Sequence, residues 1–235
     1  MKDINTSKTD VLSQAYIFLG RAFSFPDSFL QEIVKKGEGQ NLAAAITAEL
    51  PFDADLGVIP YPSQSWGDME SLYITAFDVG TQGMPPCPLY EGLIRKDEAR
   101  EGIIMELLRF YHYFDVKLSE KERDFPDHLV TELEFMAYLV QKEVRAIENG
   151  REPEPYRLAQ LDFLERHLGR WVPLLDERLQ NVVKEPFYQR LITILRSFIE
   201  AHTVYLKGLS IRKSNGDIEV ENYREKQFID MGGMR

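Results

Sequence analysis

The chain has 235 residues, of which 38 are acidic and 28 are basic, so its formal charge at neutral pH is −10. A field of this sign repels nucleic acid and anionic membrane surfaces and attracts cationic partners. The same acidic excess also serves solubility alone, and charge by itself does not separate the two roles. Hydrophobic residues make up 44% of the chain, which is ample for a packed core and excludes extensive disorder.

The cysteine content indicates a reducing compartment. Cys87 is the only cysteine, which excludes an internal disulfide and a zinc site built from several thiolates. The first ten residues, MKDINTSKTD, contain neither an apolar stretch nor paired arginines, so we expect no export signal there. No apolar run reaches the length of about 18 residues that a spanning helix needs. These features predict a soluble, cytoplasmic protein without membrane insertion.

Helical periodicity dominates the first part of the chain. Apolar residues recur at three- and four-residue spacing from Val11 to Phe23, and Thr9 or Asp10 can cap this helix. Pro26 ends it. The helices predicted in this part are residues 9–23, a short segment beginning at Asp27 or Ser28, residues 41–50 and residues 66–78.

The second part begins with a loop. Residues 79–92 are rich in proline and glycine and therefore have little freedom to become helical. Ser119–Glu122 has the spacing of a capping box ahead of a long helix, and Pro186 suits the first turn of another. The helices predicted in this part are residues 96–114, 126–148, 155–168, a continuation over 171–183 after Gly169, and 185–206.

The fold class that follows is all-α. No strand alternation of useful length and no internal repeat is present. We predict a single-domain helical bundle with a proline-rich central loop, formed by residues 1–208. Residues 209–235 are polar and contain several glycines, and we predict that they form a mobile C-terminal tail.

The segment PPCPLYEG, residues 85–92, is the first candidate binding element. Prolines lower the entropy cost of ordering a loop, so they hold Tyr90 and Glu91 in a fixed display. A tyrosine beside a carboxylate can stack on a guanidinium group and also pair with its charge. The alternative is a connector whose aromatic side chain fills the core.

The segment FPDHLVTELEFM, residues 125–136, is the second candidate binding element. Asp127 is expected in the first turn of a helix, where the helix dipole favours a negative charge. His128 and Glu132 share one flank of that helix at i, i+4 spacing. Either Asp124 or Asp127 caps the helix while His128 pairs with Glu132, or Asp127, His128 and Glu132 form an exposed rim beside the proline loop. The sequence leaves both interpretations open.

Catalytic signatures are absent. No phosphate-binding glycine loop and no nucleophile elbow occurs, and Cys87 has no histidine near it in sequence. His128 and Glu132 supply two potential metal ligands, whereas a site needs a third. We therefore expect no enzyme and no bound metal. A helical metal-dependent hydrolase using His128 and Glu132 is the alternative from a different class.

At these two segments the chain resembles the TorD/DmsD/NarJ family of cytoplasmic chaperones for twin-arginine-exported molybdenum enzymes. The resemblance rests on the order and spacing of the motifs rather than on any single motif. Two positions depart from the pattern: Leu89 separates the proline from the aromatic residue, and Gly92 stands where serine often follows. The matching residues are Leu72 and Tyr73, then Pro88, Tyr90, Glu91 and Gly92, then Pro126, Asp127 and His128, followed by Glu132 and Met136.

The resemblance implies a client-specific chaperone without turnover. Such a protein binds the twin-arginine leader of a catalytic (alpha) subunit, assists insertion of the client's molybdopterin guanine dinucleotide and delays export; it holds no permanent cofactor of its own. The most similar branch serves type II dimethyl sulfoxide reductase-like enzymes. A chaperone for a membrane-bound nitrate reductase-type enzyme is the alternative, and a structural subunit retained in a redox complex is another. Both a monomer and a domain-swapped dimer remain open.

The resemblance also implies which residues bind the leader. A leader with two arginines and an apolar segment needs carboxylates beside an apolar groove. Because exposed ion pairs contribute only about 0–1 kcal/mol each, affinity must come mainly from buried apolar area, and charge selects the register. The implied leader-binding residues are Glu91, Asp127 and Glu132 for charge, Leu72, Tyr73 and Tyr90 for the groove, and Pro88 and His128 beside them.

Overall fold

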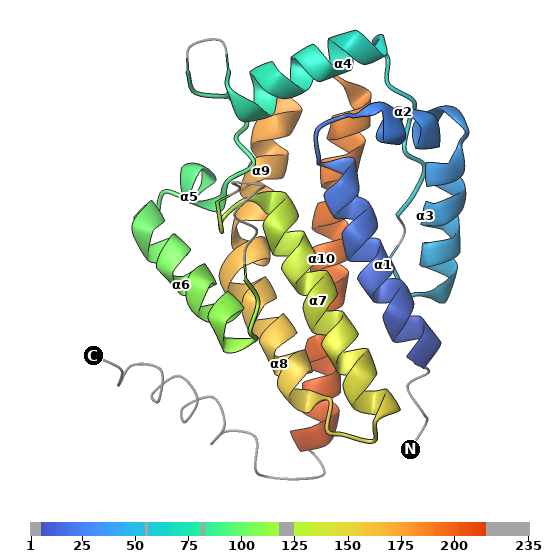
Figure 1. Cartoon of the computed structure of the whole chain (residues 1–235), viewed down its shortest axis with the longest axis vertical. Helices are drawn as coiled ribbons and strands as arrows, with labels where there is room; N and C mark the ends of the chain where they lie inside the picture. The colour runs from blue at the N-terminus through green and yellow to red at the C-terminus, as the bar shows by residue number, and fades with distance from the viewer. Residues whose placement is uncertain (1–5, 55, 81–82, 118–124, 215–235) are drawn as a thin grey trace.

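The computed structural model describes residues 6–54, 56–80, 83–117 and 125–214 (Figure 1). Within these ranges the chain is helical apart from its connections and forms no strand, as the all-α prediction requires. No helix there combines the length and apolar character of a bilayer span. The helices are α1 (Thr6–Ala22), α2 (Ser28–Lys35), α3 (Glu38–Glu49), α4 (Trp66–Tyr73), α5 (Glu91–Ile94), α6 (Arg100–Tyr113), α7 (Leu129–Glu148), α8 (Glu154–Phe163), α9 (Gly169–Val182) and α10 (Pro186–Ser214), with π-helical turns η1 (Ile74–Asp78) and η2 (Leu164–Leu168).

A central bundle organises the molecule. Helix α1 packs along α7, α7 packs against α8, and α9 packs against α10. Helices α2 and α3 lie beside α1 on one side of the bundle, and α5 and α6 lie on the other side, next to α9 (Figure 1). Helix α4 lies across one end (Figure 1). Helices α5 and α6 therefore form an arm on one side of the central bundle.

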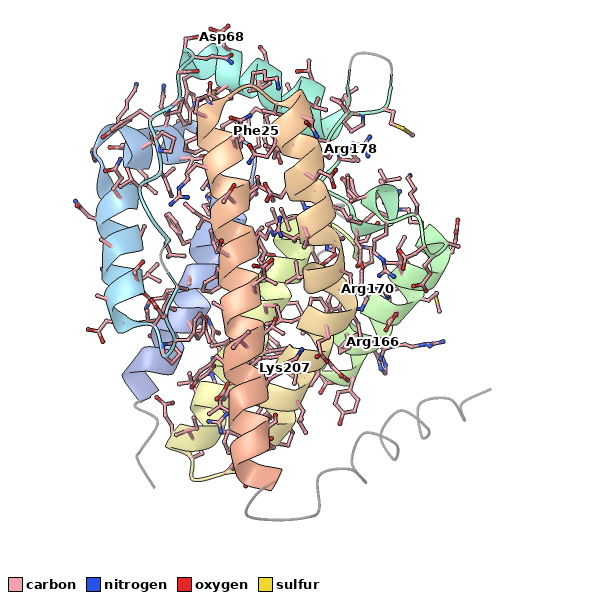
Figure 2. All side chains as sticks on the ribbon, turned by 180° about the vertical axis from the view of Figure 1, so that it is seen from behind. Phe25, Asp68, Arg166, Arg170, Arg178 and Lys207 are labelled. Carbon is pink, nitrogen blue, oxygen red and sulfur yellow. The ribbon has the colours of Figure 1, made fainter. Side chains whose placement is uncertain are left out.

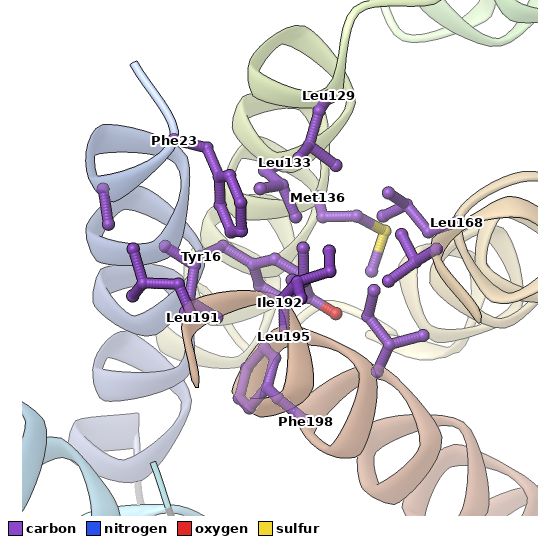
Figure 3. Close-up of a cluster of buried hydrophobic side chains, with 14 of the residues drawn as sticks. Tyr16, Phe23, Leu129, Leu133, Met136, Leu168, Leu191, Ile192, Leu195 and Phe198 are labelled. Atoms are coloured by element: carbon purple, nitrogen blue, oxygen red, sulfur yellow. The ribbon is translucent and has the colours of Figure 1, made fainter. Parts of the chain in front are cut away.

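The core lies where α1, α7, η2 and α10 face one another (Figure 3). The predicted stripe of Leu129, Leu133, Met136 and Val140 on α7 is fully buried. Each such side chain contributes roughly 1.5–3 kcal/mol when it leaves water. The side chains that meet this stripe in the close-up are Tyr16 and Phe23 of α1, Leu168 of η2, and Leu191, Ile192, Leu195 and Phe198 of α10 (Figure 3).

The helix predictions are confirmed for most of the chain, including the cap of α2, where the Asp27 carboxylate accepts a hydrogen bond from the Leu30 N–H at 2.9 Å. Helix α10 continues to Ser214, beyond the boundary predicted at residue 208. Residues 215–235 of the predicted tail lie outside the described residues, as does the capping-box segment 119–122.

Four helix starts differ from the prediction by three residues or more. Helices α1 and α3 each begin three residues earlier than predicted, at Thr6 and Glu38. Helix α6 begins at Arg100 instead of residue 96, and α7 begins at Leu129 instead of residue 126. Ahead of α7, His128 is extended, with φ −81° and ψ 137°. The backbone there is bonded to a segment far away in the sequence, because the Leu129 N–H donates to the Leu89 carbonyl at 2.8 Å. Local sequence carries no sign of such a partner, so the helix was predicted to begin too early.

The predicted continuation of the helix past Gly169 is confirmed. Helix α8, η2 and α9 run on from Glu154 to Val182, and the backbone widens into a π-turn at residues 164–168. A Cβ on Gly169 would lie 2.6 Å from the Leu164 carbonyl oxygen, so only glycine allows this close approach. The turn carries His167, which faces the site described below.

We expect Gly169→Ala to lower the free energy of unfolding by about 1–3 kcal/mol, because the added methyl group must displace the Leu164 backbone. Urea denaturation followed by circular dichroism measures this loss. The matched control is Gly208→Ala in α10, where an added Cβ meets no atom within 4 Å. That change should be neutral or stabilising by up to about 1 kcal/mol. Equal effects of the two substitutions would contradict the role assigned to Gly169.

Candidate functional site

The two candidate segments meet in the folded chain. Tyr90 and His128 form an isolated antiparallel β-bridge. The Leu129 N–H donates to the Leu89 carbonyl and the Glu91 N–H donates to the Asp127 carbonyl, both at 2.8 Å. The predicted proximity of the proline loop to the start of α7 is thus confirmed. The bridge makes them one continuous structure.

Asp127 is buried at this junction and paired with an arginine. Its carboxylate has no exposed area and accepts hydrogen bonds from Arg100 Nε at 2.9 Å and Nη2 at 3.1 Å. The Gly92 N–H donates to the same carboxylate at 3.2 Å. Asp127 lies ahead of α7 and not in its first turn, and no side chain caps that helix. The carboxylate therefore ties α5 and α6 to the start of α7.

Glu91 is the centre of a second buried cluster. Its carboxylate accepts a hydrogen bond from Arg95 Nη1 at 2.6 Å and lies 2.9 Å from His167 Nδ1. Arg95 is 2% exposed and also donates to the Arg166 carbonyl of η2 at 3.2 Å. At the surface Arg95 pairs with Asp97, and this hydrogen bond lowers the pKa of Asp97 to about 2. The cluster joins α5, the connection to α6, and η2.

The surface around this cluster adds further ion pairs. Arg166 pairs with Glu106 of α6, and Arg170 pairs with Asp97. Figure 2 shows Arg166 and Arg170 near each other on the side of the bundle that faces α6. Exposed pairs of this kind contribute about 0–1 kcal/mol each, so the buried Glu91 contacts hold the arm more strongly.

Glu132 is buried beside the indole of Trp171. Its Oε2 accepts a hydrogen bond from the Trp171 indole N–H at 3.0 Å. Burial raises the pKa of Glu132, and the negative charge of neighbouring Glu91 raises it further. Glu132 therefore keeps its proton to a higher pH than an exposed glutamate does.

These contacts correct the exposed-rim interpretation. Glu91, Asp127 and Glu132 have no exposed area, and His128 is 8% exposed. A carboxylate can be buried only where donors or cations satisfy it, and these side chains find such partners on helices distant in sequence. The rim is wrong for this structure, and the three carboxyl groups are internal.

The aromatic and apolar residues predicted to bind the leader fall into two groups, one buried and one half-buried. Tyr73 is a core residue whose hydroxyl donates to the Phe23 carbonyl at 3.1 Å, and Pro88 is buried. Leu72 is half-buried against the core, and Tyr90 is half-buried at the bridge. Of the predicted groove, only Leu72 and Tyr90 therefore present accessible area.

Sequence reasoning missed Arg100 and the surface role of Phe125. Phe125 is 52% exposed, and its ring centroid lies 6.1 Å from that of Tyr90. The Arg100 guanidinium carbon lies 4.8 Å from the Phe125 centroid and 5.3 Å from the Tyr90 centroid. The sequence carried no signal for Arg100, because the helix was predicted to begin at residue 96, which places Arg100 inside it instead of at its first position.

Exposed apolar side chains occur in η1 and in the loop that follows it. Ile74, Val79 and Met84 are 40%, 53% and 68% exposed. The N–H groups of Val79 and Gly80 both donate to the Ile74 carbonyl, at 2.9 and 3.1 Å. A Cβ on Gly80 would lie 2.3 Å from the Met84 carbonyl oxygen, so the turn is tightly closed. Grouped exposed apolar side chains are typical of a contact surface.

Metal and nucleophile chemistry has little support in the geometry. Within the described ranges no group of three or more His, Cys, Asp or Glu side chains is arranged to hold a metal ion. Cys87 is buried, and burial raises the pKa of its thiol to about 11. A protonated, inaccessible thiol is a poor nucleophile.

Comparison with known proteins gives a consistent set of relatives. The sequence model of the family described as "Nitrate reductase delta subunit" matches residues 40–177, which include both segments of the bridge. The selenate reductase assembly chaperone protein of Thauera selenatis is 37% identical over 193 residues, which cover 82% of this chain and 88% of that protein. The chlorate reductase assembly chaperone protein of Ideonella dechloratans is 44% identical over 134 residues, covering 57% and 68%. The perchlorate reductase assembly chaperone protein of Dechloromonas aromatica is 37% identical over 138 residues, covering 59% and 61%.

The protonation of Glu132 predicts a characteristic pH dependence. The ordinary pKa of a glutamate is 4.5. As the pH rises above this value, the unfolded chain releases the Glu132 proton while the folded chain keeps it, so the free energy of unfolding falls. Glu132→Gln removes this loss. Relative to the unmodified chain, the variant should gain up to about 1.4 kcal/mol of stability per pH unit between pH 5 and the raised pKa.

Urea denaturation at pH 5, 6, 7 and 8 measures this difference. Glu134→Gln, on the exposed face of the same helix, is the control and should show no such slope. Glu91→Gln should instead cost about 1–3 kcal/mol at pH 7, because it removes the buried carboxylate from Arg95 and leaves it the exposed carboxylates of Asp97 and Glu98. A pH-independent gain from Glu132→Gln would show that Glu132 is ionised in the fold.

Proposed function

Because the chain belongs to the nitrate reductase delta subunit family, we propose that it is an assembly chaperone for the catalytic subunit of a molybdenum-containing oxidoreductase. The resemblance noted at the two motif segments is confirmed at the level of the family. The relatives are named as chaperones and not as catalysts. The metal-dependent hydrolase is therefore set aside.

The proposed client is a type II dimethyl sulfoxide reductase-like enzyme. The relatives named for selenate, chlorate and perchlorate reductases support this choice over a membrane-bound nitrate reductase-type client. The client receives its molybdenum cofactor, as molybdopterin guanine dinucleotide, while the chaperone holds the apoprotein in the cytoplasm. The cofactor is cargo of the client, and the chaperone needs no cofactor site of its own.

We propose that the chaperone recognises a twin-arginine leader at the surface beside the Tyr90–His128 bridge. The observation that carries this proposal is the arrangement of one proline-rich segment. The stretch from Ile74 to Met84 exposes the side chains of Ile74, Val79 and Met84. Further along the chain, Tyr90 lies beside Phe125. A leader offers an apolar segment and two arginines, and the surface offers apolar area and aromatic rings to match them.

The energetic roles of these contacts differ. Apolar area buried on binding contributes about 25 cal/mol per Å², so the leader's apolar segment supplies most of the affinity. The formal charge of −10 attracts a cationic leader and speeds its approach. Leu72 and Tyr90 contact the leader directly. The buried Glu91 and Glu132 hold the surface in shape.

Binding of a synthetic leader tests this function. The probe is a synthetic twin-arginine leader peptide, with two adjacent arginines followed by an apolar segment, titrated by isothermal calorimetry. Tyr90→Ala and Phe125→Ala should each weaken binding about tenfold, or about 1.4 kcal/mol, because each removes a ring from the surface. Val204→Ala, which truncates a side chain 70% exposed on α10, should have no effect.

Two outcomes would argue against leader binding. The first is the absence of heat and of a melting shift with the cognate leader. The second is a pull-down from native cells that recovers the mature enzyme, without its leader, at fixed stoichiometry. That result would indicate a structural subunit retained in the redox complex.

A further inference from the structure

We infer that Arg100 is an internal substitute for a client arginine, and that a leader arginine binds by displacing it from a site formed by Asp127, Tyr90 and Phe125. The inference rests on the proposed leader binding and specifies where the arginine is recognised. In the structure described here, the arginine site is therefore occupied by the chaperone's own Arg100.

The site has the chemistry of an arginine receptor. The two nitrogens of Arg100 that reach Asp127 lie 2.9 and 3.1 Å from different carboxylate oxygens, which is the two-point contact that suits a planar guanidinium. The rings of Phe125 and Tyr90 lie 4.8 and 5.3 Å from the guanidinium carbon. Cation–π contact from two rings adds to the ion pair. An arginine from any other chain would be held by the same groups.

The position of Arg100 in its own helix does not account for this contact. Arg100 is the first residue of α6, where the helix dipole disfavours a positive charge, and the preceding Ala99 provides no side-chain cap. Arg100 is therefore held by Asp127 and the two rings. The exposed carboxylate of Glu101 is next to Arg100 in the sequence and can attract the displaced guanidinium, whereas Asp97 and Glu98 already pair with Arg95.

The Arg100 side chain covers the carboxylate of Asp127. The Arg100 side chain is 27% exposed, whereas Asp127 has no exposed area. A ligand arginine consequently reaches Asp127 only after Arg100 moves. The Gly92 N–H still donates to the carboxylate at 3.2 Å, so Asp127 keeps one donor during the exchange.

Gly92 admits Arg100 to the site. A Cβ at residue 92 would lie 2.3 Å from Arg100 Cγ, 2.9 Å from Arg100 Cβ and 3.1 Å from Arg100 Cα. Any larger residue at this position therefore pushes the first residue of α6, and with it the Arg100 side chain, away from the loop. This gives a way of emptying the site without removing the charge of Arg100.

Self-occupation reduces the apparent affinity for any arginine ligand, because binding is limited to the fraction of molecules whose site is vacant. A lone arginine gains too little to displace Arg100. A leader that also covers the exposed apolar turn gains more. The internal arginine thus sharpens selection of arginine together with an apolar segment.

Two variants of the full chain test the inference. Arg100→Gln removes the internal guanidinium, and Gly92→Ala displaces it while keeping its charge. The probes are a fluorescent peptide with two adjacent arginines followed by a leucine- and alanine-rich segment, and a matched peptide with both arginines replaced by glutamine. Fluorescence anisotropy measures binding, and circular dichroism verifies that each variant is folded.

Both variants should bind the arginine peptide about tenfold more tightly than the unmodified chain, because a vacant site removes the competition. Their affinity for the glutamine peptide should not change. Arg196→Gln is the charge-matched control, since it removes one exposed arginine from distant α10, and it should leave both affinities unchanged.

The outcomes separate this inference from the proposed function. Equal or weaker binding of the arginine peptide by both folded variants would overturn the internal substitute and leave leader binding intact. Tighter binding of both peptides would also overturn it, because the gain would not depend on arginine. Failure of the unmodified chain and of every variant to bind the arginine peptide would overturn both proposals.

Discussion

The buried carboxylate of Glu91 is the contact on which the site depends. It receives Arg95 from the following turn and faces His167 from η2, so it joins a short one-turn helix to the long central bundle. Without it, Arg95 would keep only the exposed carboxylates of Asp97 and Glu98 as counter-charges. The backbone of Glu91 also donates to Asp127 and so sets the register of the bridge.

From this contact the rest of the site is built outward. The bridge brings Tyr90 to the start of α7, and Asp127 in turn binds Arg100 at the start of α6. Glu132 completes the interior through its hydrogen bond from Trp171, and its raised pKa reflects burial and the charge of neighbouring Glu91. The motif carboxyl groups thus shape a surface, and the groups that a partner meets first are aromatic or aliphatic.

This division suits a chaperone that recognises a peptide without changing it. A stable bundle holds a small arm through buried polar contacts, and such contacts are specific in geometry. The arm carries the bridge and Arg100, so displacement of that side chain by a client would act directly on the contacts that hold α5 and α6 in place. Recognition and the state of the arm are physically linked in the proposed mechanism.

The sequence by itself determined the helical class, most helix positions and the two segments that form the site. Apolar spacing along Leu129, Leu133 and Met136 reports burial directly, since a helix repeats every 3.6 residues. The carboxylates were identified as important, but their burial was not predictable, because it depends on Arg95, Arg100 and Trp171 arriving from other helices. The start of α7 and the π-turn at Gly169 were likewise decided by contacts across the fold. Local patterns encode which face of a helix is apolar, whereas pairing between distant polar groups exists only once the chain has folded, so only the tertiary structure decided that these carboxylates lie inside.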